Sequence, residues 1–185
     1  LTSIDASGTE TLNGNSTSSS KSHSHDTAIP SLFIERESDS GVRVGLDYIP
    51  VEGAMGSQSR ADTDYTTGDG ASVTRQAKAD LQNHITLYTE IPLRSSDFFV
   101  RAGVVSVTIS TDENLDSTGS TYPDDDVMGY NIGLGHQRDI GTNGFLKITL
   151  NHVNYGDIEL TSSSGNTIVA NADRTGLQFS FGKKF

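Results

Sequence analysis

Apolar and polar residues alternate with a period of two along most of this chain, which is the pattern of β-strands with one apolar and one polar face. The clearest stretch is 41–48, where every second residue is apolar and the residues between are glycine or charged. Its apolar positions are Val42, Val44, Leu46 and Tyr48. The same alternation covers 84–91, 128–135 and 177–182, and it is less regular over 28–37, 98–109 and 145–155. The sequence therefore predicts an all-β fold.

One of these segments changes phase. In 98–109 the apolar positions are first Phe98, Val100, Ala102 and Val104, and then Val105, Val107 and Ile109. A β-bulge inserts one residue into a strand and shifts the alternation by one. We therefore expect a bulge near Val104.

Composition excludes several classes of protein. The longest apolar runs, such as 32–34 and 98–100, are three residues long, whereas a membrane-spanning helix needs ~20 predominantly apolar residues. The chain has no cysteine and therefore no disulfide, thiolate zinc site or cysteine nucleophile. Its 13 lysines and arginines are scattered against 24 acidic residues, for a formal charge of −11. Because nucleic-acid binding needs a clustered basic face, no nucleic-acid partner is expected.

The connections between predicted strands alternate in length. Three are short, at 38–41, 92–97 and 138–144. The others are long, polar and mostly rich in Ser, Gly and Asp, and they cover 6–27, 51–75, 110–126 and 156–172. In an antiparallel meander every second connection lies at the same end, so one end should carry tight turns and the other extended loops.

Two architectures fit this pattern. A soluble sandwich or lipocalin-like barrel would bury the apolar face, whereas a transmembrane barrel turns it toward lipid and keeps a polar interior. The glycine-rich and charged polar face, the asymmetry of the connections and the terminal Phe185 favour the transmembrane barrel.

The last ten residues, 176–185, carry a more specific signal. Apolar residues occupy alternate positions and the chain ends on an aromatic, at Leu177, Phe179, Phe181 and Phe185. This ending resembles the assembly signal of the small eight-stranded bacterial outer-membrane barrels of the OmpA and OmpX type, although Lys183 departs from it where an apolar residue is commoner. The departure is tolerable because a lysine near the membrane edge can extend into the headgroups.

The resemblance implies a single antiparallel up-and-down barrel over 1–185, in the outer membrane of a Gram-negative bacterium. It implies contact with outer-membrane lipid and lipopolysaccharide, recognition by the barrel assembly machinery, periplasmic short turns and extracellular long loops. Seven strands are counted from Ala28 onward, and the last must end on the periplasmic side. We therefore expect residues 1–5 to be the remnant of a truncated first strand whose other half precedes Leu1.

The glycine and charge face would line the lumen. Its predicted polar network consists of Glu35, Arg43, Asp47, Tyr88, Glu90, Arg101, Lys147 and Arg174. The strand register is expected to place Arg101 opposite Tyr88 and diagonal to Glu90, within reach of long side chains. Because buried charges must be paired and an eight-stranded interior is just wide enough for side chains, we expect a plugged lumen. We expect the inward Gly45 to tolerate serine unless packing there is tight.

Other groups carry weaker signals. Calcium could bind Asp124, Asp125 and Asp126 with Asp112, Glu113 and Asp116, but EF-hand spacing is lacking and a solvated acidic tip is favoured. His23 and His25 could bind a metal only with further ligands. His84, His136 and His152 show no arrangement with a nucleophile and an acid, and no catalytic or phosphate-binding motif occurs. No catalytic residue, metal or cofactor is expected.

The primary hypothesis is a non-enzymatic outer-membrane barrel that either supports envelope integrity or takes part in surface recognition. In the second case, phage or another surface ligand would bind its long loops. The alternative is a narrow porin-like channel for ions or small solutes. A second alternative is a soluble ligand-binding β-barrel, which would stay monodisperse without detergent.

Overall fold

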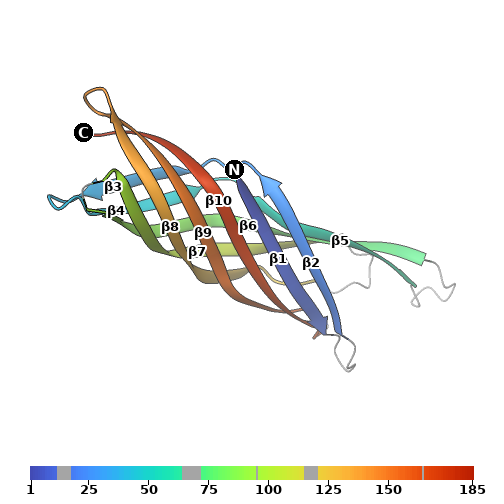
Figure 1. The fold of residues 1–185 in the computed structure, drawn as a ribbon. Coiled ribbons are helices and arrows are strands. Elements are labelled where there is room, and N and C mark those ends of the chain that lie inside the picture. The colour runs from blue at the N-terminus through green and yellow to red at the C-terminus, as the bar shows by residue number, and fades with distance from the viewer. Residues whose placement is uncertain (12–17, 64–71, 95, 115–120, 164) are drawn as a thin grey trace.

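A computed structural model describes residues 1–11, 18–63, 72–94, 96–114, 121–163 and 165–185. All its regular elements are strands, and they form one antiparallel sheet curled into an elongated barrel (Figure 1). The strands are β1 (Thr2–Thr11), β2 (Ser18–Thr27), β3 (Leu32–Glu37), β4 (Arg43–Ile49), β5 (Gly53–Thr63), β6 (Ser72–Pro92), β7 (Phe98–Asn114), β8 (Asp125–Ile140), β9 (Gly144–Thr161) and β10 (Thr167–Lys183). The described residues include no helix that is both long and apolar enough to cross a membrane.

The sheet has the order β2-β1-β10-β9-β8-β7-β6-β4-β3, with β5 also paired to β6. Because β4 and β5 pair with consecutive stretches of β6, they follow one course that is interrupted at 50–52. The first and last long strands meet where β1 pairs with β10, and Leu1 exchanges two backbone hydrogen bonds with Leu177. Within the described residues, the edge of β10 beyond Leu177 and the outer edge of β3 are not paired with each other.

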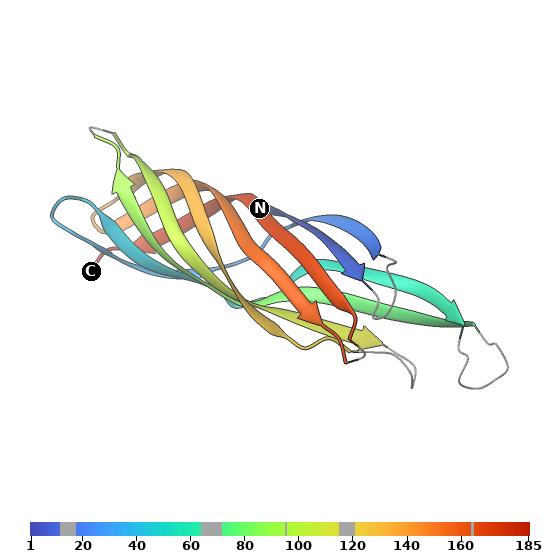
Figure 2. The same cartoon turned by 90° about the horizontal axis from the view of Figure 1, so that it is seen from below.

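The two ends of the barrel differ. One end, which we call the turn end, carries the connections 38–42, 93–97 and 141–143 and the C-terminus. The opposite, loop end carries the connections that include residues 12–17, 64–71, 115–120 and 164, which lie outside the described residues. Figure 2 shows that the ribbon of β5 and β6 extends farther than its neighbours at the loop end.

The long connections are shorter than the sequence pattern predicted. Residues 6–11 and 18–27 form strands rather than parts of one loop. The ribbons also lengthen into 53–63 and 72–75, into 110–114 and 125–126, and into 156–161 and 167–172. In 6–11 and 18–27, polar residues occupy both faces and leave no clear alternation, yet their backbones still pair across the sheet. In 156–161 the alternation is present, because Ile158 and Leu160 point inward between Asp157 and Glu159. Residues 2–5, expected as the remnant of a first strand, continue into 6–11 as β1, which pairs with residues 167–176 of β10.

Near the turn end the sheet carries an apolar outer belt. Large apolar side chains on neighbouring strands are 39–73% exposed there, including Ile34, Val44, Leu46, Leu87, Val100, Ile132, Leu134, Ile148, Leu150, Phe179 and Phe181. A soluble barrel would bury such a surface, whereas a lipid-facing belt of this kind is the feature that a membrane barrel requires.

Near the loop end the two faces exchange character. The interior becomes apolar and holds the buried cluster Ile4, Met55, Leu81, Val105, Val107, Ile109, Val127, Val153, Tyr155, Ile158, Leu160 and Ala172. Strand β7 shows the change within one segment, because Arg101 points inward in the belt and Val107 points inward nearer the loop end. This part of the barrel has the inside and outside of a water-soluble β-structure.

The predicted bulge near Val104 is wrong. Buried and exposed positions alternate without interruption through Phe99, Val105 and Ile109, so the pleat of β7 is continuous. The apolar positions shift by one residue because the outward side chains are apolar in the belt, whereas the inward side chains are apolar nearer the loop end. The register shift lies across from it in β6, between Gln82 and Ile85, where Asn83 has a φ of 52°.

Because the two faces exchange character along the barrel, two outward substitutions at different levels should differ in their cost to stability. Leu46→Arg lies in the apolar belt and should cost about 2–4 kcal/mol of stability in liposomes, as a charge on the lipid face does. Val169→Arg also replaces an exposed apolar residue, but it lies near the loop end opposite Glu159 and should change stability by less than about 0.5 kcal/mol. Urea titrations of both refolded variants measure the difference, and equal costs would contradict the assigned belt.

Candidate functional site

The interior of the belt is organised around one buried carboxylate, that of Glu90 on β6, which is 0% exposed. Arg43 donates to it from β4, with Nε 2.8 Å from Oε2. Arg101 donates from β7, with Nη2 2.6 Å and Nε 3.0 Å from Oε1. Lys147 donates from β9, with Nζ 2.9 Å from Oε2. Three strands therefore direct their cations at one anion, and Arg101 lies directly opposite Glu90 rather than opposite Tyr88 as the sequence suggested.

The network continues from Lys147 to a second carboxylate. Lys147 Nζ lies 2.8 Å from Glu35 Oε2, and the Tyr88 hydroxyl donates to the same oxygen at 3.0 Å. On the other side, Arg101 donates to the Gln178 side chain at 3.2 Å, and Gln178 donates to Asp47 at 2.8 Å. Seven of the eight residues predicted for the lumen are thus joined in one hydrogen-bonded network, with Gln178 as a link. Arg174 lies outside it.

Aromatic rings surround these cations. Arg101 stacks over Tyr88 with its guanidinium carbon 4.0 Å from the ring centre, and Arg43 lies 5.0 Å from the ring centre of Phe99. Lys147 lies 5.3–5.6 Å from the ring centres of Phe33, Phe99 and Phe145. Cation–π contacts of this kind strengthen where water is excluded. The charges and rings together fill the lumen near the turn end.

Inward glycines make room for these rings. Gly45 pairs with Tyr88, Gly135 with Phe99 and Gly182 with Phe145 on neighbouring strands. A Cβ atom added at any of the three would lie 2.2–2.4 Å from the paired ring. Because real Cβ contacts are never that short, packing at Gly45 is tight, and the condition under which serine would be tolerated there is not met.

Beyond the charges lies a polar cavity of about 380 Å³. Its polar lining includes Asp47, Thr86, Arg101, Asn131, Asn151 and Arg174, and the remaining wall is formed by Ile49 and by residues of 1–2, 29–33 and 176–181. Asn131 Oδ1 and Asn151 Oδ1 are buried without a hydrogen-bond partner. A cavity with such groups is suited to ordered water.

At the loop end, side chains of two connections and of β1 cover the apolar cluster. Tyr122 packs against the apolar cluster, and its hydroxyl donates to Glu10 Oε1 at 2.9 Å. Burial and the Glu10 carboxylate raise the pKa of the Tyr122 hydroxyl above its ordinary value, so it remains a donor at neutral pH. Thr121 and Ser163 exchange hydrogen bonds that join the segment before β8 to the turn after β9.

Three of the acidic residues considered for calcium hydrogen-bond within β7, β8 and the connection between them. Asp124 accepts from the backbone of Thr111, Glu113 accepts from the backbone of Tyr122, and Asp126 accepts from Thr108. Asp112 lies 3.5 Å from Lys78, while Asp116 lies outside the described residues. Asp125 is the first residue of β8. Within the described ranges no group of three or more His, Asp or Glu side chains is placed to hold a metal.

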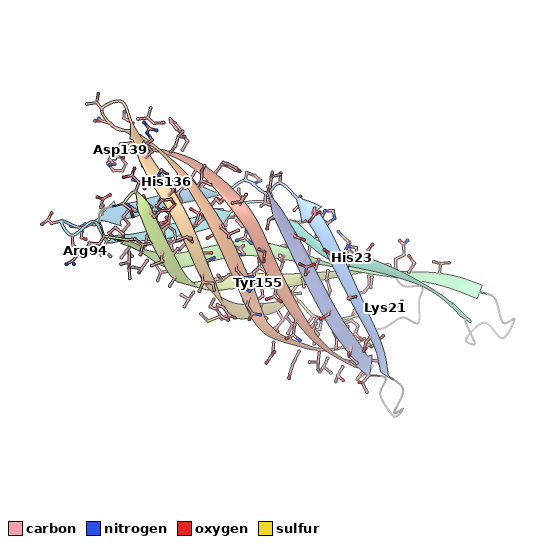
Figure 3. All side chains as sticks on the ribbon, viewed as in Figure 1. Lys21, His23, Arg94, His136, Asp139 and Tyr155 are labelled. Carbon is pink, nitrogen blue, oxygen red and sulfur yellow. The ribbon has the colours of Figure 1, made fainter. Side chains whose placement is uncertain are left out.

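The histidines are dispersed, as Figure 3 shows for two of them. His23 stacks on His25 in β2, with ring centres 6.4 Å apart. His136 packs edge-on against Phe98 near the turn end, and His152 contacts Thr175 on the outer face. His84 alone points into the lumen, where it is buried.

The residues of the terminal signal all lie on the outer surface. Leu177 is 44% exposed, Phe179 65% and Phe181 73%, and Phe185 is fully exposed. They extend the apolar belt along β10 to the end of the chain.

A barrel with a lipid-facing belt, a polar interior at the same level and short turns at one end is a membrane barrel of the outer-membrane class. The fold is similar to that of the outer membrane protein OprG from Pseudomonas aeruginosa, with a TM-score of 0.50 and 12% sequence identity. That similarity covers 100% of this chain and 95% of the other. No sequence-family model matches the chain, and no curated protein sequence matches it either. The chain thus has the fold of a small outer-membrane β-barrel.

Removing the central anion should be costly. Glu90→Gln leaves Arg43, Arg101 and Lys147 facing one another without the carboxylate that all three contact, and breaking a buried ion pair in this way costs about 3–5 kcal/mol. Urea unfolding in liposomes measures the loss, with the exposed Glu159→Gln as the matched control. Equal stability of the two variants would show that the network does not hold the barrel together.

Proposed function

We propose that this protein is a non-enzymatic outer-membrane barrel with a closed lumen, which anchors a polar surface outside the membrane. The observation that carries the proposal is closure at two levels. The Glu90 network and its rings fill the lumen near the turn end, and the apolar cluster fills it near the loop end. A hydrated path would have to cross both.

The length of the strands supports a role for the outer surface. A strand needs about 9–11 residues to cross a bilayer, whereas β6 has 21 residues and β9 has 18. About half of each strand therefore stands outside the membrane. Its outward face is polar, and the chain carries a formal charge of −11. Such a surface suits a role in envelope integrity or recognition by phage or another surface ligand. The remaining partners in this proposal are outer-membrane lipid and lipopolysaccharide, which would surround the barrel.

A narrow channel for ions or small solutes is the second candidate. The polar cavity of about 380 Å³ favours it, because water and small solutes could occupy the middle of the lumen. Rearrangement of the apolar cluster would then be needed to connect the cavity to the loop end.

Recordings in planar bilayers distinguish the two candidates. We expect the refolded wild-type protein to give no steady conductance, because charged and apolar layers both exclude a continuous column of water. A porin refolded in parallel verifies that insertion is detected. Steady, ohmic conductance of the wild type would reject the closed lumen and establish the channel.

We further propose that Leu177, Phe179, Phe181 and Phe185 are read by the barrel assembly machinery of a Gram-negative bacterium. Their exposure along one strand offers an apolar handle. Deleting Phe185 should lower the amount of folded protein in outer membranes, while Phe185→Tyr retains it. Refolding of the deletion variant into micelles should be nearly unchanged, because micelles require no recognition step. Full recovery of the deletion variant from cells would contradict this role.

A further inference from the structure

Basic side chains border the apolar belt on its outer face at the turn end. On β8, Arg138 is exposed and pairs across the sheet with Leu146, which is 47% exposed. On β10, Lys183 is exposed two residues after Phe181, which is 73% exposed. Paired residues share a face of the sheet, and so do alternate residues of one strand. Arg138 and Lys183 therefore both project outward at the border of the belt.

The two cations flank one open position of β9. Lys183 pairs with Gly144 of β9, and Phe181 pairs with Leu146, which pairs with Arg138 on its other side. Arg138 and Lys183 thus lie diagonally across β9, in strands about 10 Å apart. Gly144 carries no side chain between them. Long side chains from the two strands can therefore approach one anionic group from both sides.

Neither cation is neutralised by a neighbouring side chain. Within the described residues, no carboxylate lies within 4.0 Å of the Arg138 guanidinium or the Lys183 ammonium. The carboxylate of Asp139, which Figure 3 labels at the turn end, binds Lys184 instead, with Nζ 2.8 Å from Oδ2. Asp139 also belongs to the other face of β8, because it pairs with the buried Phe145. Both cations are available to an external anion.

The opposite border of the belt carries charge of the other sign. On its loop-end side, β8 has the exposed Asp126 and β10 has Asp173, whose side chain is 41% exposed. On β3, by contrast, the cationic border of the turn end recurs, since the exposed Arg36 follows the exposed Ile34 on the outer face. An anionic headgroup is therefore attracted to the turn-end border of β8 and β10 and repelled at their loop-end border.

We propose that Arg138 and Lys183 bind the phosphodiester of an anionic phospholipid of the phosphatidylglycerol class, in the membrane leaflet at the turn end. Leu146 lies beside Arg138 and Phe181 precedes Lys183, so the acyl chains of the same lipid can pack against exposed apolar side chains. Long basic side chains extend from a lipid-facing surface into the headgroups, where anionic lipid attracts them. A zwitterionic headgroup carries its own ammonium, which competes for the phosphate.

The inference deepens the proposed function and rests on it, because the belt must stand in a bilayer for these cations to meet a headgroup. It adds the class of lipid that the turn end selects. The formal charge of the whole chain is −11, so overall charge alone would repel an anionic lipid. A preference for such a lipid must therefore come from local cations.

The probe is a bilayer that contains equal amounts of phosphatidylglycerol and phosphatidylcholine. The refolded protein is inserted into it and then released gently, and native mass spectrometry identifies the lipid that stays bound. We expect phosphatidylglycerol to be retained several-fold more often than phosphatidylcholine at low ionic strength. The preference should fall when salt screens the exposed charges. Equal retention of the two lipids by the wild type would overturn the site, whether or not any variant folds.

Arg138→Gln and Lys183→Gln should each lower the preference, and the double variant should abolish it. Lys21→Gln is the control, because Lys21 is an exposed cation on β2 near the loop end (Figure 3), and it should keep the preference of the wild type. An unchanged preference in the double variant would contradict the assignment. Displacement of the lipid by inorganic phosphate at constant ionic strength would assign the cations to a soluble anion and overturn the lipid site too.

Insertion into vesicles of phosphatidylcholine alone separates this inference from the proposed function. Failure of the wild type to insert would reject the membrane function and the lipid site with it. Insertion without a preference for phosphatidylglycerol would reject the lipid site alone.

Discussion

The structure depends on one constraint: the same continuous strands pass through two environments that demand opposite surfaces. In the belt, the outward residues are apolar and the inward ones are polar, as lipid requires. Nearer the loop end the outward residues are polar and the inward ones are apolar, as water requires. Strand β7 meets both demands without breaking its pleat, because the residue chemistry changes at Val104 and Val105 while the geometry does not.

A polar interior inside an apolar belt creates its own problem, which the Glu90 network solves. Charges that leave water must find partners of opposite sign in good geometry. Three cations from separate strands converge on one carboxylate, and the excess is balanced by Glu35 on Lys147 and by Asp47 through Gln178. The same contacts tie β4, β6, β7 and β9 together across the lumen, so closure of the interior and cohesion of the barrel arise from one set of bonds.

The exchange of the two faces along the strands and the Glu90 network are the basis of the proposed function. In the function we propose, a closed interior makes the membrane part an anchor, and strands such as β6 and β9, about twice the length needed to cross a bilayer, carry a polar surface above it. At the level where the interior changes character, His84 is buried against the Tyr155 ring.

Alternation alone determined the all-β architecture, the strands that flank the tight turns and, within the apolar belt, the face that lines the lumen, because side chains in a strand necessarily point to opposite sides. It could not show that residues 6–11 and 18–27 are strands, since polar residues on both faces carry no hydropathy signal. It also suggested a bulge in β7 where only the surroundings change. Register decided the rest: only the paired strands show that Glu90 faces Arg101, that Gly45 must accommodate Tyr88, and that Arg174 lies apart from the network. Those relations join residues far apart in the chain, and the fold alone brings them within bonding distance.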